Sequence, residues 1–203
     1  MIALEYQIFT PSKARSTISE NLIVYSLWIF SICLFIIADK IQPLEDFIAP
    51  FKTVYLVIAT LLSIFFSISP IFRHERLSGK ITGILKINLD FITINDISYP
   101  INELLKIDFH FGDYFGQLNK SGNGNFNPLL SEGVSNSLEF TDCSNKRHQI
   151  HFKLNYKWEH KRLFPFITEM IKINKISFLR GIEILGINDY NKIQEFKKSL
   201  IAI

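Results

Sequence analysis

Cysteine, methionine and tryptophan are scarce in this chain of 203 residues, which contains two of each. The two cysteines, Cys33 and Cys143, are too few for a disulfide framework, so the sequence favours a reducing compartment. Glycine (9 residues) and proline (7 residues) are also few, which excludes collagen-like and low-complexity classes. The net charge is only +3, too small an excess to favour nucleic acid as a partner.

Charge is absent from two long apolar segments, residues 21–38 and 53–72. At 1.5 Å per helical residue, each is long enough to cross a bilayer core of about 30 Å. Neither segment has the polar face of a surface helix in a soluble protein, and the first lacks a signal-peptide cleavage pattern. The sequence predicts a transmembrane hairpin over residues 21–72 that follows a cytoplasmic N-terminal tail, residues 1–20.

Basic residues concentrate on the outer flanks of the hairpin, whereas its connector carries two lysines against three acidic residues. The flanking residues are Lys13 and Arg15 on one side and Arg73, Arg76 and Lys80 on the other. By the positive-inside rule, both termini then face the cytoplasm. Frequent Ile, Lys, Asn and Phe are typical of an AT-rich bacterial genome, so we expect a multi-pass protein of the bacterial inner membrane.

Small hydroxyl side chains form a stripe on the second span. They are Thr60, Ser63 and Ser67, with Thr53 two turns earlier on the same face. Such residues let helices approach closely and form hydrogen bonds between them. The first interpretation is packing against the first span, and the alternative is self-association into a homo-oligomer.

From residue 77 onward, apolar and polar residues alternate in short runs, which predicts antiparallel strands. The runs are 85–89, 92–95, 105–111, 138–141 and 150–154, with turns at 95–96 and 144–145. In the third run, Leu105, Ile107 and Phe109 are expected on the buried face. The pattern predicts an α+β domain built on an antiparallel meander or barrel.

Helical periodicity replaces the alternation after residue 157. Five apolar residues share one face and predict an amphipathic helix at residues 158–174, begun or kinked near Pro165: Leu163, Phe166, Ile167, Met170 and Ile171. A last helix is expected over 189–200 with Asp189 as its N-cap. We expect a domain over 77–175 with its own core and a C-terminal extension over 176–203. The sequence gives residues 175–188 no helix or strand assignment.

The meander of residues 80–154, closed by the amphipathic helix, resembles bacterial pleckstrin-homology-like (PH-like) domains. The best match is GILKINLDFITINDISYPINELLKIDF, residues 83–109. Similar modules often follow a two-helix hairpin in small bacterial membrane proteins, and the resemblance implies binding rather than catalysis. The layout is also similar to two-transmembrane, β-rich effectors of nucleotide-signalled antiphage systems, whose barrel senses a cyclic nucleotide. This chain differs from those effectors in having helical segments after the strands.

A long loop, residues 112–133, separates two of the expected strands. Loops of about twenty residues inside a compact domain are usually functional or disordered. The loop is not a P-loop, because a P-loop has its glycines before the lysine and a helix after it. It remains either a binding or assembly loop or a plain insertion, with these candidate contact residues: Asp113, Tyr114, Lys120, Asn123 and Asn125.

Histidines and carboxylates form no catalytic motif in the sequence. His148 and His151 are three residues apart on a strand and therefore point to opposite faces, whereas Asp108 and His110 share a face but lack further ligands. Nucleophile-elbow, paired-cysteine and dinucleotide motifs are also absent. The sequence therefore predicts neither an enzyme nor a metal or cofactor site.

Residues 73–203 contain 18 Lys or Arg against 14 Asp or Glu. Anionic lipid headgroups attract such residues, although an ordinary solvated surface is the alternative. The candidates for membrane-surface or ligand contact are Arg73, Arg76, Lys80, Lys146, Arg147, Lys157 and Lys161. Together these patterns predict a tethered cytoplasmic module that binds a ligand, lipid or protein, with a membrane-disrupting, cyclic-nucleotide-switched effector as the alternative.

Overall fold

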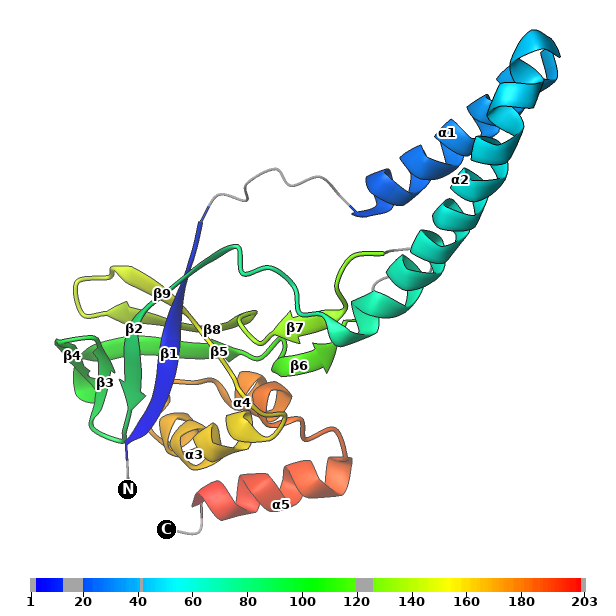
Figure 1. The fold of residues 1–203 in the computed structure, drawn as a ribbon. Coiled ribbons are helices and arrows are strands. Elements are labelled where there is room, and N and C mark those ends of the chain that lie inside the picture. Colours follow the sequence, from blue (N-terminus) through cyan, green and yellow to red (C-terminus); the bar gives the residue numbers. More distant parts are fainter. Residues whose placement is uncertain (1–2, 13–19, 41, 120–125, 202–203) are drawn as a thin grey trace. The chain divides into compact units, whose positions relative to one another are not determined.

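The computed structural model describes residues 3–12, 20–40, 42–119 and 126–201 (Figure 1). The chain divides into two compact units. The sheet unit comprises residues 1–14, 77–117 and 131–203, and the hairpin unit comprises residues 15–76 and 118–130. The chain therefore passes between the units four times, and each unit is assembled from segments that are distant in sequence.

Two antiparallel helices form most of the hairpin unit: α1 (Glu20–Lys40) and α2 (Gln42–Ile68), the latter continued by a 3-10 turn (Ser69–Phe72). Val24, Ser31 and Ala59 are buried, and Trp28 Nε1 donates to Ser63 Oγ at 2.9 Å across the pair. The segments Glu20–Ile37 and Thr53–Phe72 have mean hydropathies of 2.0 and 2.2, and only 11% of each is buried. Both helices are thus long and apolar enough to cross a membrane.

The sheet unit is α+β and contains a seven-stranded antiparallel sheet in the order β4-β3-β2-β1-β9-β8-β5. The bounds of its strands are β1 (Leu4–Pro11), β2 (Gly79–Ile87), β3 (Phe91–Ile94), β4 (Ile97–Pro100), β5 (Leu104–His110), β8 (Asn136–Asp142) and β9 (Arg147–Phe152). Strands β6 (Phe115–Leu118) and β7 (Leu130–Glu132) form a separate two-stranded sheet. The antiparallel strands expected from the alternation are confirmed, and so are the two turns, where Asn95 and Asn145 adopt φ of 54° and 63°.

Strand β1 differs from the expectation of an N-terminal tail over residues 1–20. It pairs with β2 from Leu4 opposite Ile87 to Pro11 opposite Gly79, and with β9 through Ile8 and Phe9. Tyr6 and Ile8 are buried and alternate with exposed Glu5 and Gln7 along this strand. Residues 4–11 are therefore a central strand of the sheet, and the hairpin helices are inserted in sequence between β1 and β2.

The sheet is not closed into a barrel, so the expectation of a barrel is wrong; β4 and β5 are its two edges. The outer edge of β5 is covered by a different segment, because Ile107 N donates to Lys175 O at 2.9 Å. Lys175 Nζ also donates to the carbonyl oxygens of Leu104 and Asn102. An edge strand whose backbone groups are satisfied in this way needs no closing strand.

A register shift between Leu104 and Lys106 corrects the expected buried face of β5. Leu104 is 1% exposed and Leu105 is 55% exposed, the reverse of the prediction. Ile107 and Phe109 are each 1% exposed, as expected. The bulge adds one residue to the strand, and one extra residue exchanges the two faces for everything on one side of it.

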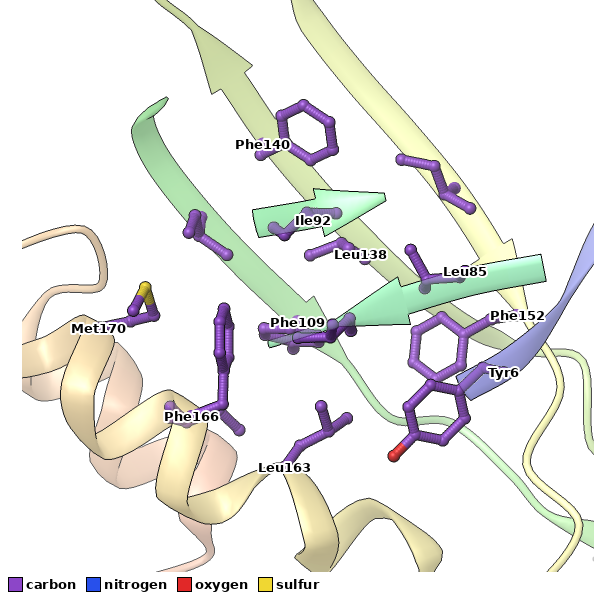
Figure 2. Packing of buried hydrophobic residues seen from close by; sticks show 14 of the residues in the cluster. Tyr6, Leu85, Ile92, Phe109, Leu138, Phe140, Phe152, Leu163, Phe166 and Met170 are labelled. Carbon is purple, nitrogen blue, oxygen red and sulfur yellow. The ribbon is translucent and has the colours of Figure 1, made fainter. Parts of the chain in front are cut away.

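The helices of the sheet unit are α3 (Phe164–Lys172), α4 (Phe178–Leu185) and α5 (Tyr190–Ile201), with a 3-10 helix at Glu159–Leu163 before α3. Figure 2 shows Leu163, Phe166 and Met170 directed toward the buried side chains of the strands, among them Phe109 and Leu138. The amphipathic helix is thus confirmed from Phe164, with Pro165 in its first turn. Asp189 is confirmed as the N-cap of α5, because its Oδ1 accepts from Lys192 N at 3.1 Å.

Candidate functional site

A pocket of about 250 Å³ lies in the sheet unit at the end of β5. It is lined by Phe111, Gly112, Asp113, Tyr114, Gln117, Leu154, Lys157 and His160. Three of these residues, Asp113, Tyr114 and Lys157, were predicted as contact residues from the sequence. They come from two different groups of candidates, the long loop and the basic surface, and the structure brings them to one pocket.

The Asp113 carboxylate is fully engaged by neighbouring protein groups. Its Oδ1 accepts from Ser135 N at 2.8 Å, and its Oδ2 accepts from the Ser131 hydroxyl. The Ser131 oxygen accepts in turn from Gly133 N at 2.9 Å. Asp113 therefore helps to fix the shape of the turn.

Asn136 is completely buried and connects the two segments of chain that form this turn, residues 112–113 and residue 133. Its Oδ1 accepts from Gly112 N at 3.0 Å, while its Nδ2 donates to the carbonyl oxygens of Asp113 at 3.0 Å and Gly133 at 2.9 Å. Gly133 has φ of 73°, and a Cβ there would lie 2.3 Å from Leu154 O, so only glycine fits. The pocket is therefore bordered by a turn that Asn136 and Asp113 hold in place through hydrogen bonds to its backbone.

A second segment of the chain contributes Lys157 and His160 to the pocket lining. The imidazole ring of His160 lies 5.4 Å from the Phe111 ring and 5.7 Å from the Phe164 ring. Burial lowers the pKa of His160 below its usual 6.5, so this side chain is neutral at pH 7. Lys157 is exposed and supplies the positive charge. The pocket thus offers one cation, a neutral imidazole and aromatic walls, which suits a small anionic or polar group.

Residues 155–162, here called the aromatic turn, follow directly on the pocket wall. Tyr156 and Trp158 are 67% and 70% exposed, although they are large aromatic side chains. Lys157, Lys161 and Arg162 are exposed beside them. The sequence placed Trp158 at the start of an amphipathic helix; instead the residue precedes a 3-10 helix and faces solvent. The sequence signal for this surface was the pair of aromatic residues that flank Lys157 a few residues after the end of β9.

The candidate residues of the long loop fall in two places. Lys120, Asn123 and Asn125 lie outside the described residues. Residues 118–119 and 126–130 belong to the hairpin unit, although the strands that the loop joins belong largely to the sheet unit. Leu129 N donates to Pro70 O at 2.9 Å, and Leu130 N donates to Arg73 O at 3.0 Å. The end of the loop is thus bonded to the segment that follows α2.

Arg73 was predicted to meet the membrane surface, but it is paired within the hairpin unit. Its guanidinium donates through both terminal nitrogens to the Glu20 carboxylate, at 2.8 Å for Nη1–Oε1, which raises the pKa of Arg73. Nη2 also reaches Phe126 O at 3.4 Å, and Phe126 N donates to Asn21 Oδ1 at 2.7 Å. The Phe126 ring lies edge-on to Tyr25 at 6.3 Å. The loop therefore contacts the start of α1 as well as the end of α2.

The predicted hydroxyl stripe on α2 forms hydrogen bonds mainly within its own helix. Thr60, Ser63 and Ser67 donate to the carbonyl oxygens of the residues four positions earlier, at 2.7–2.9 Å. Ser63 also accepts from Trp28 of α1. At Ser63 the structure therefore agrees with packing between the two helices, whereas Thr60 and Ser67 are exposed.

The remaining basic candidates are dispersed. Arg76, Lys80 and Lys146 are exposed, and Arg147 forms an ion pair with Glu139. A second pocket of about 250 Å³ on the sheet includes this pair together with Lys106, Asp108, Phe140 and Thr141. Asp108 is paired with Arg180 at 2.7 Å, so the charges there are largely matched within the protein. This makes it a weaker candidate than the pocket beside Lys157.

The two histidines of the H-x-x-H pattern lie in different surroundings. His148 stacks on Phe140 with ring centroids 4.8 Å apart, and its Nε2 lies 2.9 Å from Asp142 Oδ2. His151 pairs across the sheet with Phe9 and Ser137. Among the residues that the structure describes, no group of three or more His, Cys, Asp or Glu side chains is placed to hold a metal ion.

Comparison with known proteins gives no match to this chain among family models, curated proteins or solved structures.

Proposed function

We propose that this chain is a non-enzymatic binding module anchored in the bacterial inner membrane by α1 and α2. The observation that carries the proposal is the exposure of these helices: only 11% of each apolar segment is buried inside the protein, and large side chains such as Phe65 and Phe72 are 62% and 75% exposed. A helix that is apolar and uncovered is stable in lipid and costly in water. Membrane insertion accounts for both properties at once.

The orientation follows from the charged flanks. The basic residues Lys13, Arg15, Arg73 and Arg76 lie outside the two spans, so both termini and the sheet unit face the cytoplasm. The sheet unit supplies the binding function through the pocket that contains Lys157 and His160. Its antiparallel sheet with α3 packed on one face is consistent with a PH-like module, although the sheet is open.

Labelling of cysteines in spheroplasts tests both anchoring and orientation. Cys143 is exposed in the β8–β9 turn, and so in a Cys33→Ser chain it reports on the sheet unit. A chain lacking both native cysteines but carrying Leu44→Cys reports on the α1–α2 connection. A membrane-impermeant maleimide should label position 44 in intact spheroplasts, and Cys143 only after the membrane is permeabilised. Release of the chain by alkaline carbonate, or the reverse labelling, contradicts the proposal.

A second function is favoured by the bonding of residues 126–130 to the hairpin. We propose as the alternative an effector that oligomerises and disrupts the membrane when a cyclic nucleotide reaches the sheet unit. Such a switch needs a link between ligand site and hairpin, and the loop that begins beside the pocket provides a covalent one. A ligand shifts the population only if it binds one state better than the other.

Expression with and without cyclic dinucleotides separates the two functions. The effector predicts dye entry into cells and growth arrest only when the nucleotide is supplied, together with nucleotide binding to the purified chain by calorimetry. The anchored module predicts an intact membrane and normal growth with or without the nucleotide. A nucleotide-binding chain that leaves the membrane intact supports the sensing module and excludes the effector.

A further inference from the structure

The aromatic turn, residues 155–162, exposes two large aromatic side chains to solvent. Tyr156 and Trp158 are 67% and 70% exposed and lie two residues apart. The turn is nevertheless firmly held, because Leu163 at the end of its 3-10 helix is completely buried. Exposed aromatic side chains on a rigid support are typical of surfaces that meet a partner.

The exposed charges of this turn all have the same sign. Lys157, Lys161 and Arg162 are exposed. The only acidic residue of the turn, Glu159, is 8% exposed, and its carboxylate accepts from the backbone N–H groups of Asn155 and Tyr156. The carboxylate therefore stabilises the turn from inside, and the outward surface combines two aromatic rings with three cations.

We propose that the aromatic turn docks on the anionic phospholipid surface of the membrane in which the hairpin is anchored. Trp and Tyr prefer the headgroup region, where the ring is in an apolar layer and its polar atom remains hydrated. Lysines beside them are attracted to anionic headgroups. Membrane anchoring keeps the turn at a high effective concentration near the lipid, so a weak contact is populated. The inference rests on the proposed anchoring.

Docking also gives the neighbouring pocket a role. Lys157 belongs both to the turn and to the pocket lining. A turn docked on headgroups therefore places Lys157, one of the residues that line the pocket, at the lipid surface. The partner of the sheet unit is then anionic lipid itself, and docking is sensitive to the charge of the membrane.

The chain contains only two tryptophans, Trp28 on α1 and Trp158 in the turn, and they test anchoring and docking separately. The full chain is placed in nanodiscs of phosphatidylcholine, with or without about one third phosphatidylglycerol. A Trp158→Phe chain reports Trp28, and a Trp28→Phe chain reports Trp158. Emission wavelength and quenching by brominated acyl chains are measured for each.

Trp28 should be quenched in both lipid mixtures. Trp158 should be blue-shifted and quenched in the anionic nanodiscs and much less in the neutral ones. In the Trp28→Phe background, Lys157→Gln with Lys161→Gln should shift the docking equilibrium about thirtyfold toward the undocked state and remove most of the quenching. Lys197→Gln with Lys198→Gln on α5, which removes the same charge, should leave it unchanged.

The outcomes distinguish failure of the inference from failure of the proposed function. Unquenched Trp28 contradicts anchoring itself. Quenched Trp28 with a solvent-exposed, unquenched Trp158 in anionic nanodiscs overturns docking alone. Equal quenching of Trp158 in neutral lipid overturns the assignment to anionic lipid. A blue shift of Trp158 in detergent with a dimeric mass shows that a second copy covers the turn, and this also overturns the proposal.

Discussion

At the scale of single residues, we expect the buried side-chain amide of Asn136 to contribute strongly to the free energy of unfolding. Its side chain is completely buried and bonds to backbone groups of Gly112, Asp113 and Gly133. Asn136→Ala leaves several of these groups buried without partners, and each such group costs about 1–3 kcal/mol. We expect the free energy of unfolding to fall by about 3 kcal/mol, measured by denaturant unfolding in detergent. Gln149→Ala, an exposed amide on β9, should change it by less than about 0.5 kcal/mol.

The Asp142 carboxylate makes the free energy of unfolding depend on pH in the acid range. Its carboxylate accepts from the Ser144 hydroxyl at 2.5 Å, from Ser144 N and Lys146 N at 3.0 Å each, and from His148 Nε2 at 2.9 Å. The Ser144 hydroxyl most, and His148 next, hold the pKa of Asp142 well below its usual 3.8. Because the unfolded state binds the proton more tightly, protonation favours unfolding. The stabilisation is complete above 3.8 and is lost as the pH falls toward the lower folded-state pKa.

The Asp142→Asn chain should therefore lose less stability than the native chain as the pH is lowered below about 4. The unfolding midpoint in denaturant, followed from pH 6 downward, measures the difference. Asp96→Asn in the exposed β3–β4 turn removes the same charge and should keep the native slope. Parallel curves for the native and Asp142→Asn chains contradict the role given to this carboxylate.

Single residues also show where sequence patterns reach their limit. The buried positions Ile107 and Phe109 follow from alternation, but Leu104 and Leu105 are exchanged by the bulge. Both are leucines, so composition cannot say which one faces the core. The choice depends on pairing with β8, which is more than thirty residues away in sequence. Local patterns identify a strand, and distant partners set its register.

At the scale of elements, the contact between the loop and the base of the hairpin depends on Arg73. Its guanidinium connects Glu20 of α1 to Phe126 O, while its own carbonyl accepts from Leu130 N. Arg73→Ala should leave Glu20 unpaired and loosen residues 126–130. We expect the amides in this segment to exchange about fivefold faster, as for the loss of about 1 kcal/mol of protection, in hydrogen-exchange mass spectrometry.

Arg76 provides the matched control for this element. It is an exposed arginine three residues further along, and Arg76→Ala removes the same charge. Exchange of residues 126–130 should be unchanged in that chain. Equal acceleration in both variants indicates a general charge effect and contradicts a specific role for Arg73.

Elements with a strong local signal were predicted, and elements that depend on distant partners were not. The two apolar helices, the turns at Asn95 and Asn145 and the Asp189 cap are local features, and the structure confirms them. Helix α4 was unassigned because residues 175–188 are apolar and too short for a clear period. Its boundaries come from caps, since Ser177 Oγ accepts from Arg180 N and Gly186 ends the helix at φ of 66°.

At the scale of the whole molecule, β1 determines how the chain is organised. Residues 4–11 alternate as a strand does, but their partners β2 and β9 begin about 70 and 140 residues later. Local patterns in the sequence therefore did not indicate that this segment pairs with strands in residues 77–203. In the structure, Tyr6 and Ile8 are buried in the common core with Leu85 and Phe152. The candidate pocket was only partly predictable for the same reason, because its two walls are about forty residues apart.

A central β1 predicts which shortened chains fold. Ser12 N donates to Ser78 O at 2.8 Å, so a short Gly-Ser linker can join residue 12 directly to residue 78 and replace the hairpin. This chain should be soluble and unfold cooperatively, with dispersed amide signals by NMR. The fragment 77–203 lacks the strand between β2 and β9, which exposes two edges and the core, and it should aggregate or remain loosely packed. The linked chain with Ile8→Asp, which places a charge at a 7%-exposed core position, should behave like that fragment. Cooperative folding of residues 77–203 alone would show that β1 is dispensable.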